Sequence, residues 1–503
     1  MQPVKLNCHG INSKPAIDQA IARGLKGLFK PPPMTLHEWS EEHYYLSPES
    51  SSIAGAWETI PYQKGIMNCI SNDDIRKITW MKSARTGYTK VIVAAMGYFA
   101  EHKKRSQVVY QPTDDDRDAF VKDEIEPMLR DVPSVQQIFP WFDKKHKNNT
   151  LKKKTFLGSI LHTLGGKSPR NFRRITVDVV YYDELAGFDH DIGNEGSATS
   201  LGDTRLTTSS FPKSIRGSTP KTKDTCQIEQ SLEEADIVLR FYIPCPHCSE
   251  LDYLKWGGKD ADFGIQWEDG KASTAYYKCK HCHNSFGYEL LADLLEQGRW
   301  QSEDGVWLDD DDMFRASDGR VIDSPSHVGF HLWAAYSIFM SWADLVGEYF
   351  EAVSSAKRGE LGKLKSFINT RLGEVWEDDQ SEKLEPDVLY NRRESYPVKD
   401  NKILVPDDVV YLTIGGDTQD DRFEWEVVGW GAGEESWSID YQILYGNLSQ
   451  PEIWNVLEEM LRRTYVREDG TEMQVGLICW DSGGHFTDDV YALSKKLGLR
   501  WFI

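Results

Sequence analysis

The pattern of apolar and polar residues divides the chain into an α/β part and a part built from β-hairpins. Apolar runs at residues 78–81, 106–110 and 175–182 have the length and composition of buried strands, and segments of helix length separate them. A fourth candidate strand, at residues 213–220, ends in small and hydroxyl residues. Strands that alternate with helices predict a largely parallel sheet with its ligand along the carboxyl ends of the strands.

After residue 409 the spacing changes to the alternation that is typical of hairpins. Residues 409–416, 423–431 and 436–443 predict three antiparallel strands, followed by a helix at 451–465, a strand at 475–480 and a helix at 487–497. This order begins an RNase H-like fold, in which acids at the ends of the first and fourth strands hold two metal ions for phosphodiester hydrolysis. Asp417 and Asp481 stand at those ends, with Asp420, Asp421 and Glu424 as nearby alternatives. Either acid alone is also common in turns.

The strand at residues 78–81 leads through a loop into a helix at 90–99, which is the order of a phosphate-binding loop. With Gly87 as the second glycine of G-x-x-x-x-G-K-[ST], Thr89 is the hydroxyl for Mg²⁺, Tyr88 takes the lysine position and Lys82 the first glycine position. Lys82 or Arg85 then supplies the cation for the β- and γ-phosphates. We expect the whole loop to contact the nucleotide: Lys82, Ser83, Ala84, Arg85, Thr86, Gly87, Tyr88 and Thr89.

Two further sequence features support a nucleotide site. The buried strand at residues 175–182 is followed by Asp183 and Glu184, of which the first would hold Mg²⁺ and the second would polarise the attacking water. The alternative is that one of them caps the next helix. Upstream of the loop, Tyr62 and Gln63 are candidates for contacts with adenine, although an aromatic residue beside proline is equally typical of the start of a helix.

Length and charge limit the other possibilities. A chain of 503 residues is too long for one core, so two or three domains are expected. The net charge of −21 argues against binding nucleic acid by bulk charge, so DNA contacts must come from basic runs at residues 144–154, 167–174 and 213–223, each of which is also typical of a solvated loop. We expect a soluble intracellular protein that does not bind membranes, because neither a membrane span nor a signal peptide is recognisable.

Eight cysteines include two C-x-x-C pairs, which form the most specific local motif of the chain. Cys245, Cys248, Cys279 and Cys282 provide four thiolates for a structural, tetrahedral Zn²⁺ in a small ribbon. His247 and His281 are possible substitutes within the same motifs. The remaining cysteines are scattered, which favours a reducing compartment over a disulfide framework.

Seven motifs in this order resemble the gpA-type large terminase subunits of phages: WETIPYQKGIM, MKSARTGYTK, DVVYYDELAGFD, KSIRGSTPK, CPHC, KSFINTRLGEVWE and ICWDSGG. The resemblance covers nearly the whole chain. It implies a motor that uses ATP to package double-stranded viral DNA into a procapsid, joined to an endonuclease that cuts concatemers. By this resemblance Lys82 is a displaced Walker A lysine, Thr89 the Mg²⁺ hydroxyl, Asp183 the Walker B acid and Glu184 the catalytic acid. Ser218 and Thr219 would couple hydrolysis to movement.

The resemblance also implies cofactors and partners. The cofactors are ATP, Mg²⁺ or Mn²⁺, and Zn²⁺. The partners are double-stranded DNA, a small terminase subunit bound through the N-terminal segment, a portal bound through a C-terminal tail, and further copies of the chain. The expected location is the host cytoplasm. Arg170, Arg173 and Arg174 are candidates for an arginine finger. The alternatives are a helicase-like ATPase with an inserted zinc ribbon, and a catalytically degenerate prophage protein for DNA binding or assembly.

The expected fold class is therefore α/β, with a P-loop ATPase domain around a parallel sheet, an inserted zinc ribbon and an incomplete RNase H-like domain. The expected segments are an N-terminal helical segment at 1–50, the ATPase at 51–240 and 301–385, the ribbon at 241–300, a linker at 386–406 and the nuclease at 407–503. Because the chain stops at Ile503, within an expected strand, we expect a third carboxylate and the portal-binding tail to be absent and DNA cutting to be weak.

Overall fold

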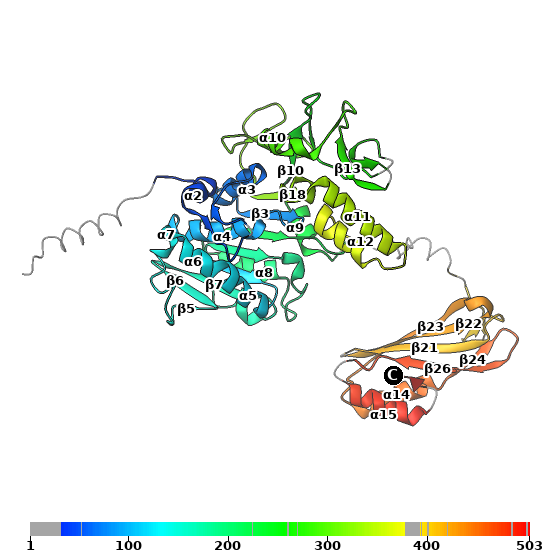
Figure 1. The fold of residues 1–503 in the computed structure, drawn as a ribbon. Coiled ribbons are helices and arrows are strands. Elements are labelled where there is room, and N and C mark those ends of the chain that lie inside the picture. Colours follow the sequence, from blue (N-terminus) through cyan, green and yellow to red (C-terminus); the bar gives the residue numbers. More distant parts are fainter. Residues whose placement is uncertain are drawn as a thin grey trace, which may run out of the picture. The chain divides into compact units, whose positions relative to one another are not determined.

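The computed structural model describes residues 32–377, apart from 52, 224, 259, 260 and 269, and residues 393–502, apart from 394, 400, 401, 420, 484, 485, 499 and 500. The chain divides into two compact units, Met1–Asp379 and Gln380–Ile503, which are described separately (Figure 1). The helix expected at residues 17–29 lies outside the described residues.

A 13-stranded sheet forms the centre of the first unit. Its middle strands are parallel, in the order β10 (Ile237–Pro244), β18 (His327–Leu332), β3 (Lys77–Lys82), β9 (Lys213–Ser218), β8 (Val179–Asp183), β4 (Gln107–Gln111) and β7 (Ser159–Gly165). Antiparallel strands complete the sheet: β6 (Lys153–Phe156) and β5 (Asn149–Thr150) beside β7, and β11 (Leu251–Tyr253), β15 (Arg299–Gln301), β16 (Trp307–Leu308) and β17 (Phe314–Arg315) on the β10 side. The four strands expected from the sequence thus lie side by side in the middle of one sheet.

Both faces of this sheet are covered, which explains why the middle strands β4, β8 and β9 are buried along their whole length. One face packs against α3 (Pro61–Ser71) and α4 (Tyr88–Glu101), and the opposite face against α8 (Ala198–Asp203) and α9 (Gln227–Glu233). Successive residues of a strand point to opposite faces, so Val109 belongs to the first cluster and Val108 to the second. The remaining α-helices among the described residues of this unit are α2 (Leu36–His43), α5 (Asp114–Phe120), α6 (Glu126–Asp131), α7 (Pro133–Gln136), α10 (Leu291–Glu296), α11 (Trp342–Ala356) and α12 (Gly362–Phe367).

The cysteine-containing insertion forms a small sheet of its own, with β12 (Gly264–Glu268), β13 (Lys271–Lys278) and β14 (Ser285–Phe286). Trp256 and Trp267 from this insertion pack on Tyr349 of α11, with ring centroids 5.1 and 5.6 Å away. The insertion is therefore anchored on α11. Because β10 and β15 belong to the main sheet, it is shorter than the expected 241–300.

The second unit contains a five-stranded sheet in the order β23 (Ser436–Tyr445), β22 (Arg422–Trp430), β21 (Tyr411–Thr418), β26 (Leu477–Trp480) and β27 (Trp501–Phe502). β21 is antiparallel to β22 and parallel to β26, as the RNase H-like pattern predicts. The buried residues of these strands alternate with exposed ones, and the buried face packs against α14 (Pro451–Leu461) and α15 (Thr487–Leu497).

Two local predictions in this region are wrong. The helix expected to run to residue 465 ends at Leu461, and β24 (Thr464–Arg467) follows it. β24 pairs with β20 (Lys402–Val405) and β25 (Glu472–Gln474), and β20 also pairs with β19 (Val398–Lys399). The expected linker at 386–406 thus supplies two strands. The second partner of β20, β24, lies far along the chain, so no local pattern reveals this pairing.

Candidate nucleotide, zinc and nuclease sites

The loop between β3 and α4 has the shape of an anion-binding loop. Arg85 and Gly87 have positive φ values of 64° and 88°, which curl the backbone before α4 begins at Tyr88. At Gly87 a Cβ would lie 2.3 Å from Nε2 of Gln63, so only glycine fits this close approach. The first N–H groups of α4 have no acceptor within the helix and are available to phosphate oxygens.

Gln63 and Tyr62 support the loop from α3. The Gln63 amide donates to the Thr86 carbonyl at 3.2 Å, and its oxygen accepts from the Ile60 N–H at 3.1 Å. Tyr62 is fully buried and packs edge-to-face on Phe241. The expected stacking of Tyr62 on adenine is not supported by this position, because neither face of a buried core ring is open to a base. Proline at the start of α3 matches the alternative reading of this segment.

Tyr88 occupies the usual lysine position but has a structural role. Its ring is buried, and its hydroxyl donates to the Tyr182 carbonyl at 2.9 Å. The ring lies directly over Gly217 of β9, where a Cβ would come within 2.2 Å of it. The Tyr88 side chain therefore joins α4 to β8 and β9, and its expected contact with nucleotide is limited to the backbone.

The displaced lysine meets the acid and the hydroxyl motif at one carboxylate. Lys82 Nζ lies 3.0 Å from Oε1 of Glu184, and the Lys82 side chain is almost fully buried. Oε2 of the same carboxylate accepts from the Ser218 hydroxyl at 3.2 Å and the Thr219 hydroxyl at 3.5 Å. Motifs from the ends of three neighbouring strands thus converge on Glu184. Arg85, the other candidate cation, is exposed.

Asp183 has the environment of a cation ligand. Its Oδ2 accepts from the Gln111 amide at 2.9 Å, while the buried Oδ1 has no hydrogen-bond partner among the described residues. Burial, and then the charge of Glu184, raise the pKa of Asp183 to about 6. An unpaired carboxylate oxygen in a buried position is stabilised by a bound divalent cation. Thr89, in the first turn of α4, is the second expected Mg²⁺ ligand.

The backbone around Leu332 and Thr370, for which the sequence predicts no role, holds the start of the loop by hydrogen bonds. The Ser83 N–H donates to the Leu332 carbonyl at 2.9 Å, and the Ala84 N–H donates to the Thr370 carbonyl at 2.8 Å. Gly373 follows with a φ of 66°, and a Cβ there would lie 3.1 Å from Ser83 N. The motif KSFINTRLGEVWE contains this glycine, but nothing in its local pattern indicates contact with a loop that is far away in the sequence.

The four cysteines form a site of tetrahedral dimensions. Cys245 Sγ lies 3.7 Å from Cys282 Sγ, and Cys248 Sγ lies 3.9 Å from Cys279 Sγ. Sulfur atoms bound to one tetrahedral Zn²⁺ are about 3.8 Å apart, which follows from a Zn–S bond of about 2.3 Å. Among the described residues, this is the only group of three or more metal-binding side chains close enough to share an ion.

The two C-x-x-C turns have the same backbone form. In each, the residue after the second cysteine has a positive φ, 62° at Ser249 and 59° at His283. The N–H of that residue donates back to the carbonyl of the first cysteine, at 2.9 and 3.1 Å. This repeated geometry points both pairs of thiols at one centre, so the donor set fits Zn²⁺.

Asp417 and Asp481 are neighbours in the second unit. Asp417 belongs to β21, and the Asp481 N–H continues the ladder by donating to the Gly416 carbonyl at 2.9 Å. Residues adjacent across parallel strands share a face, and Asp417 also pairs with Glu424 across the antiparallel strand. The carboxylates thus gather at one end of the sheet.

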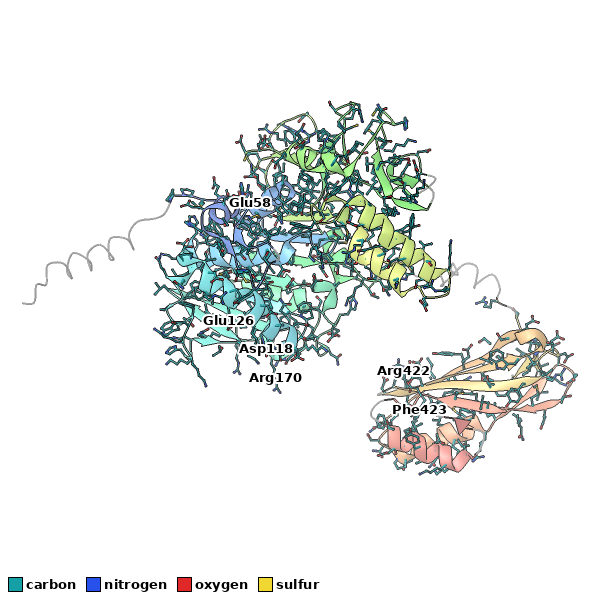
Figure 2. All side chains as sticks on the ribbon, viewed as in Figure 1. Glu58, Asp118, Glu126, Arg170, Arg422 and Phe423 are labelled. Carbon is teal, nitrogen blue, oxygen red and sulfur yellow. The ribbon has the colours of Figure 1, made fainter. Side chains whose placement is uncertain are left out.

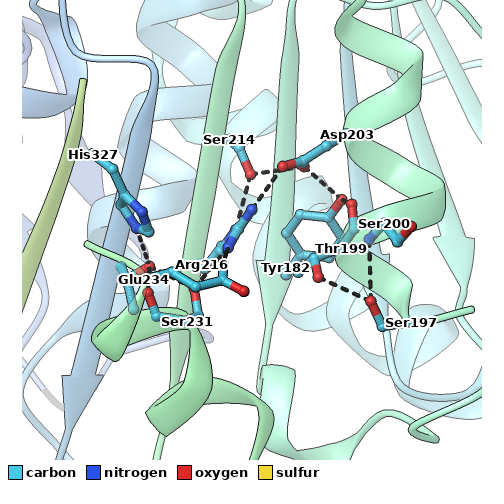
Figure 3. Close-up of polar contacts among 11 residues, drawn as sticks. Tyr182, Ser197, Thr199, Ser200, Asp203, Ser214, Arg216, Ser231, Glu234 and His327 are labelled. Atoms are coloured by element: carbon cyan, nitrogen blue, oxygen red, sulfur yellow. Dashed lines mark hydrogen bonds and ion pairs between the residues drawn. The ribbon is translucent and has the colours of Figure 1, made fainter. Parts of the chain in front are cut away.

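One of the three basic runs is partly buried. In the run at 213–223, Lys213 and Arg216 are 1% and 3% exposed. Burial lowers the pKa of Lys213 to about 7, and its ammonium donates to backbone carbonyls at the end of α3. Arg216 pairs with Asp203 at 2.7 Å inside the polar network between β9, α8 and α9 that Figure 3 shows. These two side chains stabilise the sheet and are unavailable to DNA.

Comparison with known proteins covers most of the chain. The model for the phage terminase large subunit gpA, ATPase domain, matches residues 51–300, and the model for the terminase large subunit gpA, endonuclease domain, matches residues 327–503. The second match begins at β18, which lies in the middle of the first unit's sheet. Among the described residues, no helix is long and apolar enough to cross a membrane.

Two relatives cover most of the chain. The chain is 43% identical over 480 residues to the terminase large subunit of Escherichia phage lambda and 43% identical over 484 residues to that of Enterobacteria phage P21, with 95% of this chain and 73% of each relative covered. The crystal structure of the HK97 bacteriophage large terminase aligns with a TM-score of 0.44 at 13% identity, covering 93% of this chain and 85% of that one. The chain therefore belongs to the gpA family of phage terminase large subunits, with an ATPase domain and an endonuclease domain that act in packaging phage DNA.

Proposed function

We propose that ATP is hydrolysed at the carboxyl ends of β3, β8 and β9, with Lys82 on the phosphates, Glu184 on the attacking water, and Asp183 and Thr89 holding Mg²⁺. The observation that carries this proposal is the meeting of Lys82, Ser218 and Thr219 at the Glu184 carboxylate. Bound Mg²⁺ would neutralise charge on the phosphates.

The contacts also indicate how the side chains act. In the structure, Lys82 is paired with Glu184. Triphosphate oxygens carry more negative charge than one carboxylate and compete for the ammonium group. Glu184 is then free to accept a hydrogen bond from water, while the hydroxyls of Ser218 and Thr219 keep its carboxylate oriented. Phosphoryl transfer depends on this kind of positioning and charge stabilisation.

Paired substitutions test the assignment. Lys82→Ala removes ATP turnover, because it removes the buried cation at the loop, whereas Glu184→Gln retains nucleotide binding and stops hydrolysis. Arg85→Ala is the matched control, since Arg85 lies in the same loop but is exposed. Turnover by Lys82→Ala would transfer the cation role to Arg85 or Lys90. The measurements are phosphate release and binding of a fluorescent ATP analogue.

We assign the two metal-dependent roles outside the ATPase site to the acids and the cysteines described above. Asp417 and Asp481 would hold Mg²⁺ or Mn²⁺ for endonucleolytic cutting of concatemeric DNA, and these ions would activate water at the phosphodiester. Cys245, Cys248, Cys279 and Cys282 would hold a structural Zn²⁺, because a closed set of four ligands leaves no position for substrate.

The partners follow from the family. We propose that the chain acts on double-stranded DNA with a small terminase subunit and a portal protein, in the host cytoplasm and as a homo-oligomer. Arg170, Arg173 and Arg174 are the candidates for an arginine finger that acts on a neighbouring subunit. They follow β7 at the same edge of the sheet as the nucleotide loop. All three arginines are exposed, and Arg173 pairs with Glu195. Loss of ATPase on mixing with Glu184→Gln subunits supports a finger supplied in trans, and a rate independent of protein concentration contradicts it.

A further inference from the structure

Four exposed lysines stand on the outer hairpin of the first unit's sheet. Lys144, Lys145 and Lys147 lie in the loop before β5, and Lys152 lies in the turn between β5 and β6. Among the described residues none of the four forms an ion pair, although acids outnumber bases in the chain by 79 to 58. We call these four residues the lysine hairpin.

The structure separates these lysines from one with a structural role. Lys154, in the same basic run, is buried, and its ammonium contacts Glu126 at 3.2 Å and the Asn149 amide oxygen at 2.8 Å. Figure 2 labels Glu126 in this part of the first unit, together with Arg170. Within the described part of the chain, Lys154 alone pairs with Glu126 in this region, and the four exposed lysines form no such ion pair.

The loop that carries the lysines is held in a fixed form. The Asn149 amide donates to the carbonyls of Trp141, Phe142 and Lys144, at 2.8, 3.0 and 3.1 Å. The rings of Trp141 and His146 stack with centroids 5.0 Å apart and planes 5° apart. A preformed loop presents its charges without a large entropy cost on binding.

The lysine hairpin is too far from the nucleotide loop to bind the phosphates of ATP. Four strands, β9, β8, β4 and β7, separate β6 from β3. At about 4.8 Å for each strand, the separation between β3 and β6 is roughly 24 Å. The Thr163 N–H donates to the Lys152 carbonyl at 3.1 Å, which ties the hairpin turn to β7 near its carboxyl end. The four lysines are therefore not part of the nucleotide site.

We propose that the lysine hairpin binds the phosphate backbone of duplex DNA. This inference rests on the proposed packaging function, which brings a long duplex to the motor. Lysine is a compact, strongly hydrated charge that suits contacts without sequence preference, whereas protein interfaces are depleted in lysine. Protection of an exposed sheet edge explains the charges less well, because β5 is only two residues long and short edge strands are already protected.

The test is the salt dependence of DNA binding by the full chain. A fluorescent duplex is titrated, without nucleotide, with wild type and with a variant combining Lys144→Ala, Lys145→Ala, Lys147→Ala and Lys152→Ala. Each lost phosphate contact reduces the slope of log K against log salt by about 0.9, so the slope falls by up to about 3.6. Between about 50 and 200 mM salt, wild type would lose about 150-fold more affinity than the variant.

Controls separate this inference from the proposed function. Lys357→Ala combined with Lys363→Ala removes two exposed lysines elsewhere on the same unit and leaves the slope unchanged. Replacing the four lysines with arginine retains the wild-type slope. The alanine variant keeps basal ATPase, so a failed ATPase assignment and a failed DNA site give different results. An unchanged slope in the alanine variant, the same loss per lysine in the control, or loss of self-association without loss of DNA binding would each overturn the proposal.

Discussion

Replacing Gly373 with alanine would push the backbone at the start of the phosphate loop out of position. Gly373 has a φ of 66°, and a Cβ added there lies 3.1 Å from Ser83 N, 3.2 Å from Lys82 C and 3.4 Å from Leu332 O. All three atoms belong to backbone, which cannot rotate away as a flexible side chain does. The strain is relieved only when the two backbone segments move apart by a few tenths of an ångström.

Two terms contribute to the expected effect. The left-handed conformation costs an alanine about 1–2 kcal/mol relative to glycine, and this term lowers the stability of the folded chain. The crowded Cβ adds about 1–2 kcal/mol, which is typical of an overpacked site. Because nucleotide binding requires the loop to keep its position, we expect the second term to weaken nucleotide affinity about tenfold, which corresponds to about 1.4 kcal/mol.

Gly359 provides a matched control, since it also has a positive φ, 87°, but has nothing within 4 Å of an added Cβ. Gly359→Ala should lose stability through the first term alone and bind nucleotide normally. The assays are denaturant unfolding and titration with a fluorescent ATP analogue. If Gly373→Ala binds nucleotide as tightly as Gly359→Ala does, the segment behind the loop does not set its position and the reasoning is wrong.

Three further predictions address the other sites. We expect purified protein to contain about one Zn²⁺ per chain, as the four-ligand site requires. Metal analysis should show loss of zinc in Cys245→Ser and no loss in Cys479→Ser, whose thiol is exposed in the second unit. An unchanged zinc content in Cys245→Ser would contradict the site. The pKa of Asp183 in the folded chain, about 6, lies above its ordinary value of 3.8, so ionised Asp183 lowers the free energy of unfolding. This loss is absent below pH 3.8, grows between pH 3.8 and 6, and reaches about 3 kcal/mol above pH 6. Denaturant unfolding should therefore show Asp183→Asn more stable than wild type at neutral pH, with the gain shrinking as the pH falls through about 6, and equal stability at neutral pH would refute the raised pKa. Any Mn²⁺-dependent nicking of supercoiled plasmid should disappear in Asp417→Ala and persist in Asp488→Ala, an exposed acid on α15; nicking that survives Asp417→Ala would place the metal site elsewhere.

The sequence predicts the features that depend on neighbouring residues. Apolar runs of strand length locate β3, β4 and β8, because both faces of a parallel sheet are buried and most of the strand must then be apolar. Alternation locates β21, β22 and β23, because only one face of that sheet is covered. Spacing alone pairs the four cysteines, since two residues between cysteines set the size of a metal-binding turn.

Long-range contacts decided the rest. Spacing placed Tyr88 in the lysine position and Lys213 in a basic run, but the tertiary structure buries both, because their surroundings come from strands that are far apart in the sequence. The same holds for Gly373, whose role depends on contact with Lys82 and Ser83. The sequence by itself therefore determined which residue types stand at strand ends and metal turns. Only the packing of distant segments decided which of them meet at Glu184, because a local pattern carries no information about the partner that a side chain finds across the sheet.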